Sequence, residues 1–192
     1  MHGSWRHYST CTTESGIFTI ENMISCESFE SSRVIGLDGK SEIDCSVRKS
    51  MSFIFSSKCG NAINLEMASL FRTISMDFNV TIDNPLTWKC NVYHEGDFFL
   101  PHRDSSGPTD FSERLLTLVI GLSDVSEVQG GGLELMGVSG SPWGKCNLLF
   151  RINRRDALVF ESFMLHQVTP INFGYRKSLV AFIPGRKNGN LQ

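Results

Sequence analysis

Two imidazoles and one carboxylate are the side chains of this chain that are best suited to hold a metal ion. His102 and Asp104 lie two residues apart in an extended segment, so both project from the same side of the backbone. His166, far downstream, offers a third ligand. Two histidines and one carboxylate on one face of an ion form the facial triad of non-haem Fe(II) oxygenases, which leaves further coordination positions open.

Each of these residues also has an ordinary structural explanation. A His-x-Asp pair arises often by chance, and an exposed His102 followed by a solvated Asp104 would need no function. His166 stands between Leu165 and Val168, where it could be a half-buried imidazole with satisfied hydrogen bonds. The three residues alone therefore leave both a metal site and a structural role open.

A guanidinium and a hydroxyl that follow His166 favour the metal site. Arg176 and Ser178 open an apolar segment and, two residues apart, share one face of the expected strand. A guanidinium inside a β core needs an anionic partner, because burial of an unpaired charge is costly. A carboxylate of a small dicarboxylate ligand would fit the guanidinium in bidentate geometry.

The elements that must position these residues are mostly β-strands. Alternating or continuous apolar segments separated by turn residues predict strands at 86–92, 115–122, 133–138, 147–152, 157–160, 164–168 and 176–183. The glycine run at 130–132 predicts a turn or bulge before Leu133. Many short strands at this spacing are typical of a sandwich or jelly roll.

The first half of the chain has a different pattern. Apolar residues at spacings of three and four predict one helix over 61–78, capped by Asn61. Residues 17–24 are interpreted as a strand that leads into a helix, and 36–46 as a loop. Residues 1–16, rich in Ser, Thr and His, are expected to be flexible.

Length, composition and charge limit the class of protein. The 192 residues, 41% of them hydrophobic and 20% charged, predict a single globular domain over 1–192. The net charge of -2 indicates no nucleic-acid partner, and no apolar run approaches the ~20 residues of a membrane span. Six cysteines without a CxxC pair predict reduced thiols in a cytoplasmic protein. The oligomeric state stays open.

Six ordered blocks of the sequence resemble the 2-oxoglutarate and Fe(II)-dependent dioxygenases, in particular their prolyl 4-hydroxylase-like branch. The blocks are YHEGDFF at 93–99, HRD at 102–104, RLLTLVIGL at 114–122, GGGLEL at 130–135, RDALVF at 155–160, and HQVTP through GYRKSL at 166–179. The resemblance implies a mainly β, α+β fold. Its catalytic core would be a double-stranded β-helix, or jelly roll, over 86–185, with flanking N-terminal helices.

The resemblance also implies roles for individual residues. His102, Asp104 and His166 would bind Fe(II). Arg176 would form a salt bridge with the distal carboxylate of 2-oxoglutarate, and Ser178 would assist it. Because Asp104 stands where related halogenases carry a small residue, halogenation is disfavoured.

Weaker assignments surround this set. Tyr93 matches a tyrosine whose hydroxyl contacts the co-substrate in relatives, and a role in sheet packing is equally open. Thr117 lies on a strand that lines the pocket in relatives. The loops 105–112 and 139–144 are candidates for substrate contact or ordinary connections. Arg103 is expected to point away from the metal and to join a surface salt bridge.

The resemblance implies hydroxylation of an unactivated C–H bond in an amino acid or a peptidyl residue, with proline as the leading candidate. Such a reaction uses Fe(II), 2-oxoglutarate and O2, releases succinate and CO2, and has ascorbate as a candidate stimulant. The expected partner is a small-molecule or peptidyl substrate. Two alternatives stay open, namely the same chemistry on a natural-product metabolite and a non-catalytic jelly-roll module that binds or senses a ligand.

Overall fold

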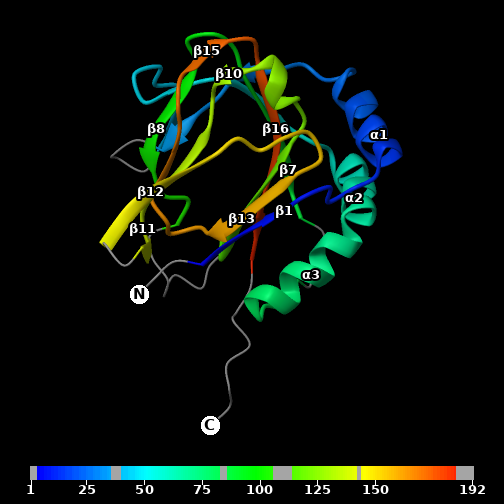
Figure 1. The fold of residues 1–192 in the computed structure, drawn as a ribbon. Coiled ribbons are helices and arrows are strands. Elements are labelled where there is room, and N and C mark those ends of the chain that lie inside the picture. The colour runs from blue at the N-terminus through cyan, green and yellow to red at the C-terminus, as the bar shows by residue number, and fades with distance from the viewer. Residues whose placement is uncertain (1–3, 36–39, 83–85, 106–113, 142–143, 185–192) are drawn as a thin grey trace.

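Two antiparallel sheets face each other in this computed structural model, which describes residues 4–35, 40–82, 86–105, 114–141 and 144–184 (Figure 1). The larger sheet contains, in spatial order, β1 (Trp5–Tyr8), β13 (Ala157–Glu161), β9 (Leu116–Gly121), β16 (Arg176–Ile183), β7 (Trp88–Tyr93), β6 (Met51–Ile54) and β2 (Glu30–Ser31). The smaller sheet contains β12 (Gly144–Phe150), β11 (Leu133–Ser141), β14 (His166–Val168), β8 (Phe98–His102) and β5 (Arg48–Lys49). The prediction of a mainly β fold is confirmed.

Two short ribbons complete the β structure. β10 (Gln129–Gly130) pairs with β15 (Ile171–Phe173), and β3 (Val34–Ile35) pairs with β4 (Ser41–Glu42). The bulge predicted at the glycine run is present, because the register shifts between Gln129 and Gly130. Gly130 has a φ of +77°, and a Cβ there would lie 2.1 Å from the carbonyl oxygen of Pro170. The tight turn therefore requires glycine at this position.

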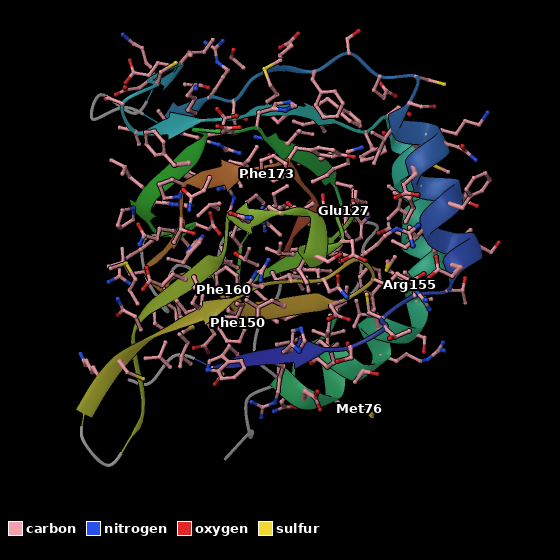
Figure 2. All side chains as sticks on the ribbon, turned by 45° about the horizontal axis from the view of Figure 1, so that its top comes forward. Met76, Glu127, Phe150, Arg155, Phe160 and Phe173 are labelled. Atoms are coloured by element: carbon pink, nitrogen blue, oxygen red, sulfur yellow. The ribbon has the colours of Figure 1, made fainter. Side chains whose placement is uncertain are left out.

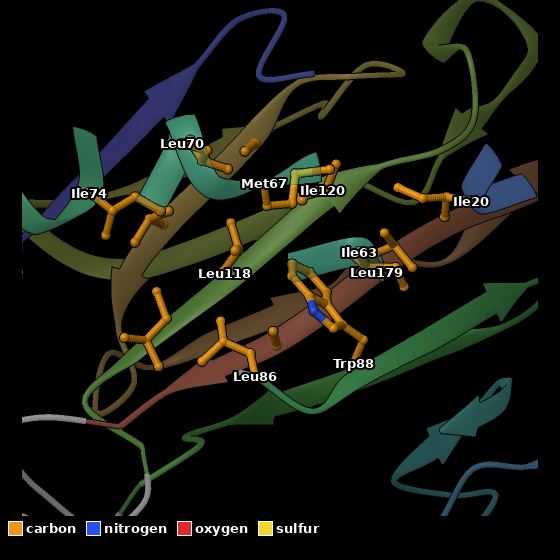
Figure 3. Packing of buried hydrophobic residues seen from close by; sticks show 14 of the residues in the cluster. Ile20, Ile63, Met67, Leu70, Ile74, Leu86, Trp88, Leu118, Ile120 and Leu179 are labelled. Atoms are coloured by element: carbon orange, nitrogen blue, oxygen red, sulfur yellow. The ribbon is translucent and has the colours of Figure 1, made fainter. Parts of the chain in front are cut away.

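Helices α1 (Glu14–Ile24), α2 (Ser57–Glu66) and α3 (Ala68–Phe78) cover the outer face of the larger sheet (Figure 1), and a short 3-10 helix η1 spans Val125–Glu127. Buried apolar side chains join the helices to the sheet (Figure 3), and the labelled ones are Ile20, Ile63, Met67, Leu70, Ile74, Leu86, Trp88, Leu118, Ile120 and Leu179. The Trp88 indole also donates to the Asn64 side-chain oxygen at 2.9 Å. This layer fixes three central strands of the sheet, β7, β9 and β16, from behind.

A second apolar cluster fills part of the space between the two sheets. It includes Phe160 of β13 and Leu135 of β11, with Phe150 of β12 packed against it (Figure 2). Trp5 of β1 contacts the Phe150 ring edge-on, with ring centroids 4.9 Å apart. The cluster closes one part of the interior and leaves a cavity elsewhere between the sheets.

Two predictions for the helical part of the N-terminal half are wrong. The apolar stripe over 61–78 belongs to two helices, which meet at Met67, and the first begins at Ser57 after a Ser56 cap. The apolar spacing continues across Met67, and no glycine or proline lies there, so the sequence pattern could not reveal the break between the two helices. Residues 17–24 are helical in α1, because Ile17, Ile20 and Ile24 repeat at helical spacing and Thr13 caps the helix.

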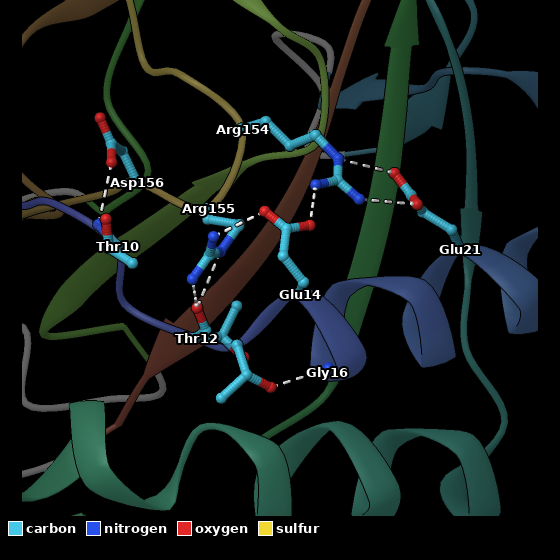
Figure 4. Close-up of polar contacts among 9 residues, drawn as sticks. Thr10, Thr12, Glu14, Gly16, Glu21, Arg154, Arg155 and Asp156 are labelled. Atoms are coloured by element: carbon cyan, nitrogen blue, oxygen red, sulfur yellow. Dashed lines mark hydrogen bonds and ion pairs between the residues drawn. The ribbon is translucent and has the colours of Figure 1, made fainter.

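The predicted flexibility of residues 1–16 is wrong for residues 4–16, which are held by strand pairing and ion pairs. β1 pairs with β13, with Trp5 opposite Phe160, and ion pairs hold the start of α1 (Figure 4). Arg155 bonds Glu14 and the carbonyl of Thr12, so the contacts that order this segment come from residues about 140 positions away. The polar composition of residues 1–16 alone could not predict these long-range contacts. In the predicted loop 36–46, the described part includes the short strand β4.

All seven strands predicted for the second half are present, with ends shifted by a few residues. β8, β10 and β15 were missed. Within the part of the chain that the structure describes, no helix combines the length and apolar character that crossing a bilayer requires.

Candidate metal centre

Strand pairing brings the two predicted histidine ligands together. His102 ends β8 and His166 begins β14, and these residues are direct partners in the antiparallel register. Asp104 follows two residues after His102. Its carboxylate lies 3.6 Å from His102 Nε2 and 3.4 Å from His166 Nε2. One ligand atom from each of the three residues falls within 4.8 Å of the others, which suits a single metal ion.

Backbone carbonyls orient both imidazole rings. Nδ1 of His102 lies 2.9 Å from the Leu100 carbonyl oxygen, and Nδ1 of His166 lies 2.9 Å from that of Met164. A carbonyl oxygen can only accept, so each Nδ1 carries the proton and donates it. Each Nε2 lone pair is then directed toward Asp104 and is available to a metal.

The Asp104 carboxylate is held by a separate set of contacts. Thr117 Oγ1 on β9 donates to Asp104 Oδ2 at 2.7 Å, and the Thr117 and Ser162 hydroxyls are 2.9 Å apart. The Asp104 backbone amide donates to the Ser162 carbonyl at 2.9 Å. These bonds fix the carboxylate between the two sheets, although Asp104 itself lies outside any strand.

The protonation states of the three residues suit metal binding. Burial, helped by repulsion from His166, lowers the pKa of His102 to about 4, so its ring is neutral at pH 7. Burial alone would raise the pKa of Asp104, but its contacts with His166 and His102 and the hydrogen bond from Thr117 lower it overall. Neutral imidazoles with one ionised carboxylate form the donor set that a divalent ion requires.

A buried guanidinium lies in the same cavity as this triad. The cavity has a volume of about 360 Å³ and is lined by both sheets. Arg176 is 9% exposed, its Nη1 donates to Ser178 Oγ at 3.1 Å, and its guanidinium lies 5.6 Å from the Tyr93 ring centroid. No carboxylate among the described residues pairs with Arg176, so the charge lacks the partner that burial normally demands.

The remaining predicted residues lie at or near this cavity. Tyr93 and Thr117 both line it, and Tyr93 pairs with Arg176 across β7 and β16. The Thr117 hydroxyl is bonded to Asp104, whereas that of Tyr93 is 3.5 Å from Arg48 Nη2. Arg103 is exposed and donates to the Phe163 carbonyl, so the expected salt bridge is absent among the described residues.

The two candidate substrate loops cannot be placed in full. Of 105–112, only Ser105 lies within the described residues. The structure assigns the backbone of 139–141 to β11 and that of Gly144 to β12, while 142–143 lie outside the described residues.

Sequence reasoning missed four basic residues that line the cavity, namely Arg33, Arg48, Lys89 and Arg114. A signal for Lys89 was present, because it shares a strand face with Tyr93. The polar positions of this strand resembled a solvent-exposed face, although they face the cavity. Arg48 lies in a segment for which no strand was predicted, so nothing in the local pattern marked it.

Comparison with known proteins places the chain in a family. Residues 88–184 match the model of the 2OG-Fe(II) oxygenase superfamily, where 2OG denotes 2-oxoglutarate. The chain belongs to this superfamily. A curated relative, the PKHD-type hydroxylase IL0759 of Idiomarina loihiensis, is 30% identical over 98 residues. That match covers 48% of this chain and 39% of the relative's length.

Solved structures of the same class share the fold. A prolyl-4-hydroxylase of Pseudomonas putida has a TM-score of 0.69 at 16% identity, and the match covers 98% of this chain and 95% of that one. A prolyl hydroxylase of Trichoplax adhaerens, in complex with a peptide fragment of the hypoxia inducible factor oxygen degradation domain, has a TM-score of 0.64 at 16% identity, with coverages of 94% and 83%. These structures confirm the predicted jelly-roll fold, and the match to the 2OG-Fe(II) oxygenase superfamily confirms the predicted family.

Proposed function

We propose that this chain is a 2-oxoglutarate-dependent non-haem iron dioxygenase that hydroxylates an unactivated C–H bond of an amino acid or peptidyl residue, with release of succinate and CO2. The observation that carries the proposal is the opening of the His102–Asp104–His166 set and the unpaired Arg176 into one cavity. A metal-ligand set and a buried cation in one cavity fit a metal that binds together with a carboxylate ligand.

The protein's own residues provide the geometry for this chemistry. In the proposal, His102 Nε2, His166 Nε2 and an Asp104 oxygen hold Fe(II) on one face. The bound metal and 2-oxoglutarate supply the oxidising chemistry. Thr117 keeps the Asp104 carboxylate in position, and the Leu100 and Met164 carbonyls keep the rings in the required tautomer.

Arg176 and Ser178 form the proposed site for the distal carboxylate of 2-oxoglutarate. The two side chains are already hydrogen-bonded on one face of β16, so the guanidinium is oriented before the ligand arrives. Tyr93 pairs with Arg176 between β7 and β16, and its ring is proposed to line one side of this site. Its hydroxyl is the proposed contact to the co-substrate.

Proline, free or in a peptide, remains the leading candidate for the primary substrate. The similarity to prolyl hydroxylases of P. putida and T. adhaerens supports a search among prolyl compounds first. The same chemistry on a natural-product metabolite and a non-catalytic binding module are the alternatives. A single domain over 1–192 and a cytoplasmic location also remain proposals, and all six cysteines are free thiols in the structure.

Succinate release tests the proposed function. The purified protein is incubated with Fe(II), ascorbate, 2-oxoglutarate and a panel of free amino acids and prolyl peptides. We expect succinate from the wild type and none above background from Asp104→Ala, with the exposed control variant Glu27→Ala unchanged. A folded wild type that releases no succinate, or an Asp104→Ala variant that equals it, would contradict the proposal and favour the binding module.

A further inference from the structure

Besides Arg176, five basic side chains line the cavity. Arg33 and Arg103 are exposed and donate to the Ser41 and Phe163 carbonyls. The other three, Arg48, Lys89 and Arg114, form the basic cluster, which has no assigned role in the function described above. Asp104 is the single carboxylate among the described lining residues, and the proposed metal and Thr117 already engage it. The cavity is therefore rich in positive charge that its own described residues do not neutralise.

Arg48 is buried and has only neutral partners. Its side chain is 7% exposed, Nε donates to Ser50 Oγ at 2.9 Å, and Nη2 donates to Asn91 Oδ1 at 2.9 Å. Nη2 also lies 3.5 Å from the Tyr93 hydroxyl, so Arg48 stands next to the proposed co-substrate site. Its guanidinium lies 4.5 Å from the Phe99 ring centroid. These contacts orient the guanidinium and leave its charge without a counter-ion, which is a costly arrangement in a protein interior.

Lys89 and Arg114 extend this charge toward the metal ligands. Lys89 lies on the cavity face of β7, and no acidic side chain of the described residues forms an ion pair with it. Burial, followed by repulsion from Arg48 and Arg114, lowers its pKa to about 8. The Arg114 guanidinium packs 4.1 Å from the Phe182 ring centroid and donates to the Asp104 carbonyl at 3.3 Å.

Lys89 is separated from Arg176 along the sheet. Arg176 is opposite Tyr93, and Lys89 is four residues further along β7, which is roughly 14 Å of strand. The carbon chain of 2-oxoglutarate is only about 5 Å long when extended, given the usual length of a C–C bond.

We propose that the basic cluster binds an oxyanion of the primary substrate, a carboxylate or a phosphate, so that this enzyme acts on an anionic substrate. This inference rests on the proposed function, since it places the anion beside the proposed metal centre. Guanidinium groups bind such oxyanions in bidentate geometry, and the ammonium of Lys89 adds a third donor group. Binding of the anion would anchor the substrate with its reacting carbon near the metal.

Anion binding to the protein loaded with Zn(II) and saturating 2-oxoglutarate tests the inference without turnover. The probes are acetate and inorganic phosphate, with acetamide as the neutral match of acetate, and the readout is the NMR shift of lysine and arginine side-chain signals. We expect acetate or phosphate to bind and acetamide not to bind. The tighter of the two anions identifies the substrate's group as a carboxylate or a phosphate.

Single substitutions locate the binding site. Lys89→Met and Arg114→Gln are each expected to weaken anion binding roughly tenfold or more, as the loss of one charge-assisted hydrogen bond implies. Lys58→Met, which removes an exposed lysine of α2 outside the cavity, should leave binding unchanged. Thermal melting of each variant confirms that it is folded.

Two results would overturn the inference. One is a protein that binds 2-oxoglutarate but neither anion, or that binds the anions equally well in all variants. The other is anion binding that disappears when 2-oxoglutarate saturates, because the cluster would then serve the co-substrate. The same titration without 2-oxoglutarate separates the two proposals, since failure to bind 2-oxoglutarate contradicts the proposed function while anion binding is still measured.

Discussion

The two faces of the larger sheet have opposite chemistry, although the same strands form both. On β7, β9 and β16, alternate side chains point toward the helices or into the cavity. The helix face is apolar, with Trp88, Cys90, Leu118, Ile120, Leu179 and Ala181. The cavity face carries Lys89, Asn91, Tyr93, Thr117, Arg176 and Ser178 beside the apolar Val119, Val180 and Phe182. One face is built for packing, whereas the other adds polar and charged groups that burial disfavours.

The arginines of the two regions make the same contrast. Arg154 pairs with Glu14 and Glu21, and Arg155 pairs with Glu14, where these residues tie α1 to the turn before β13 (Figure 4). In the cavity, Arg48 and Arg176 are more deeply buried and have no carboxylate partner among the described residues. Charges that hold the fold together are thus paired within the protein, whereas those in the cavity are left for ligands.

The largest expected effect on stability is on the helix face. Trp88→Ala removes a fully buried ring and its hydrogen bond to Asn64, and it should lower the free energy of unfolding by about 3–5 kcal/mol. Urea denaturation measures the change. Ile54→Ala, an exposed residue on β6 of the same sheet, should cost less than about 0.5 kcal/mol. Equal losses in the two variants would contradict the assignment of this face as the core.

On the cavity face, Arg176→Gln should act on ligand binding. Loss of a charged hydrogen-bonding group implies roughly a 10–100-fold weaker affinity for 2-oxoglutarate. The affinity for the metal should stay the same, because Arg176 does not belong to the triad. Calorimetric titration of the wild type and the variant with each ligand separates the two affinities. If the variant loses the metal and retains 2-oxoglutarate binding, the assignment of Arg176 is wrong.

Thr117→Val should have a smaller effect, on the metal alone. The substitution keeps the shape of the side chain and removes the hydrogen bond to Asp104 Oδ2. Loss of such a supporting contact typically weakens metal binding about 10–100-fold, and we expect the lower end, since Asp104 keeps its backbone anchor. Competition with a metal chelator gives the affinity. Thr87→Val, at an exposed position, is the control.

The smallest predicted effect is a change of metal-free stability with pH. The pKa of His102 is about 4 in the folded protein and about 6.5 when unfolded, so between these values the unfolded chain binds more protons. Stability should therefore fall as the pH drops from about 6.5 to about 4. Denaturation at several pH values measures the slope, which His102→Gln should reduce. An unchanged slope in that variant would show that His102 is not the group responsible.

The sequence predicted the cavity face better than the helical layer. Alternating or continuous apolar segments predicted the strands that carry Tyr93, Thr117 and Arg176. Side chains alternate between the two faces of a strand, so the direction of each one follows from its position. The break between α2 and α3 and the pairing of β1 with β13 depend on contacts between distant residues, which no local pattern contains. Arg48 was missed for the same reason, since β5 is a two-residue strand defined by its pairing with β8.

Anaerobic titration with Fe(II) and 2-oxoglutarate is the most direct test that the cavity face is a site for metal and co-substrate. The chelate of the two ligands absorbs weakly in the visible range. We predict that the band appears in the wild type and is absent in His166→Ala, while His94→Ala, a histidine outside the cavity lining, retains it. A folded wild type without the band, or a His166→Ala variant that keeps it, would contradict the account.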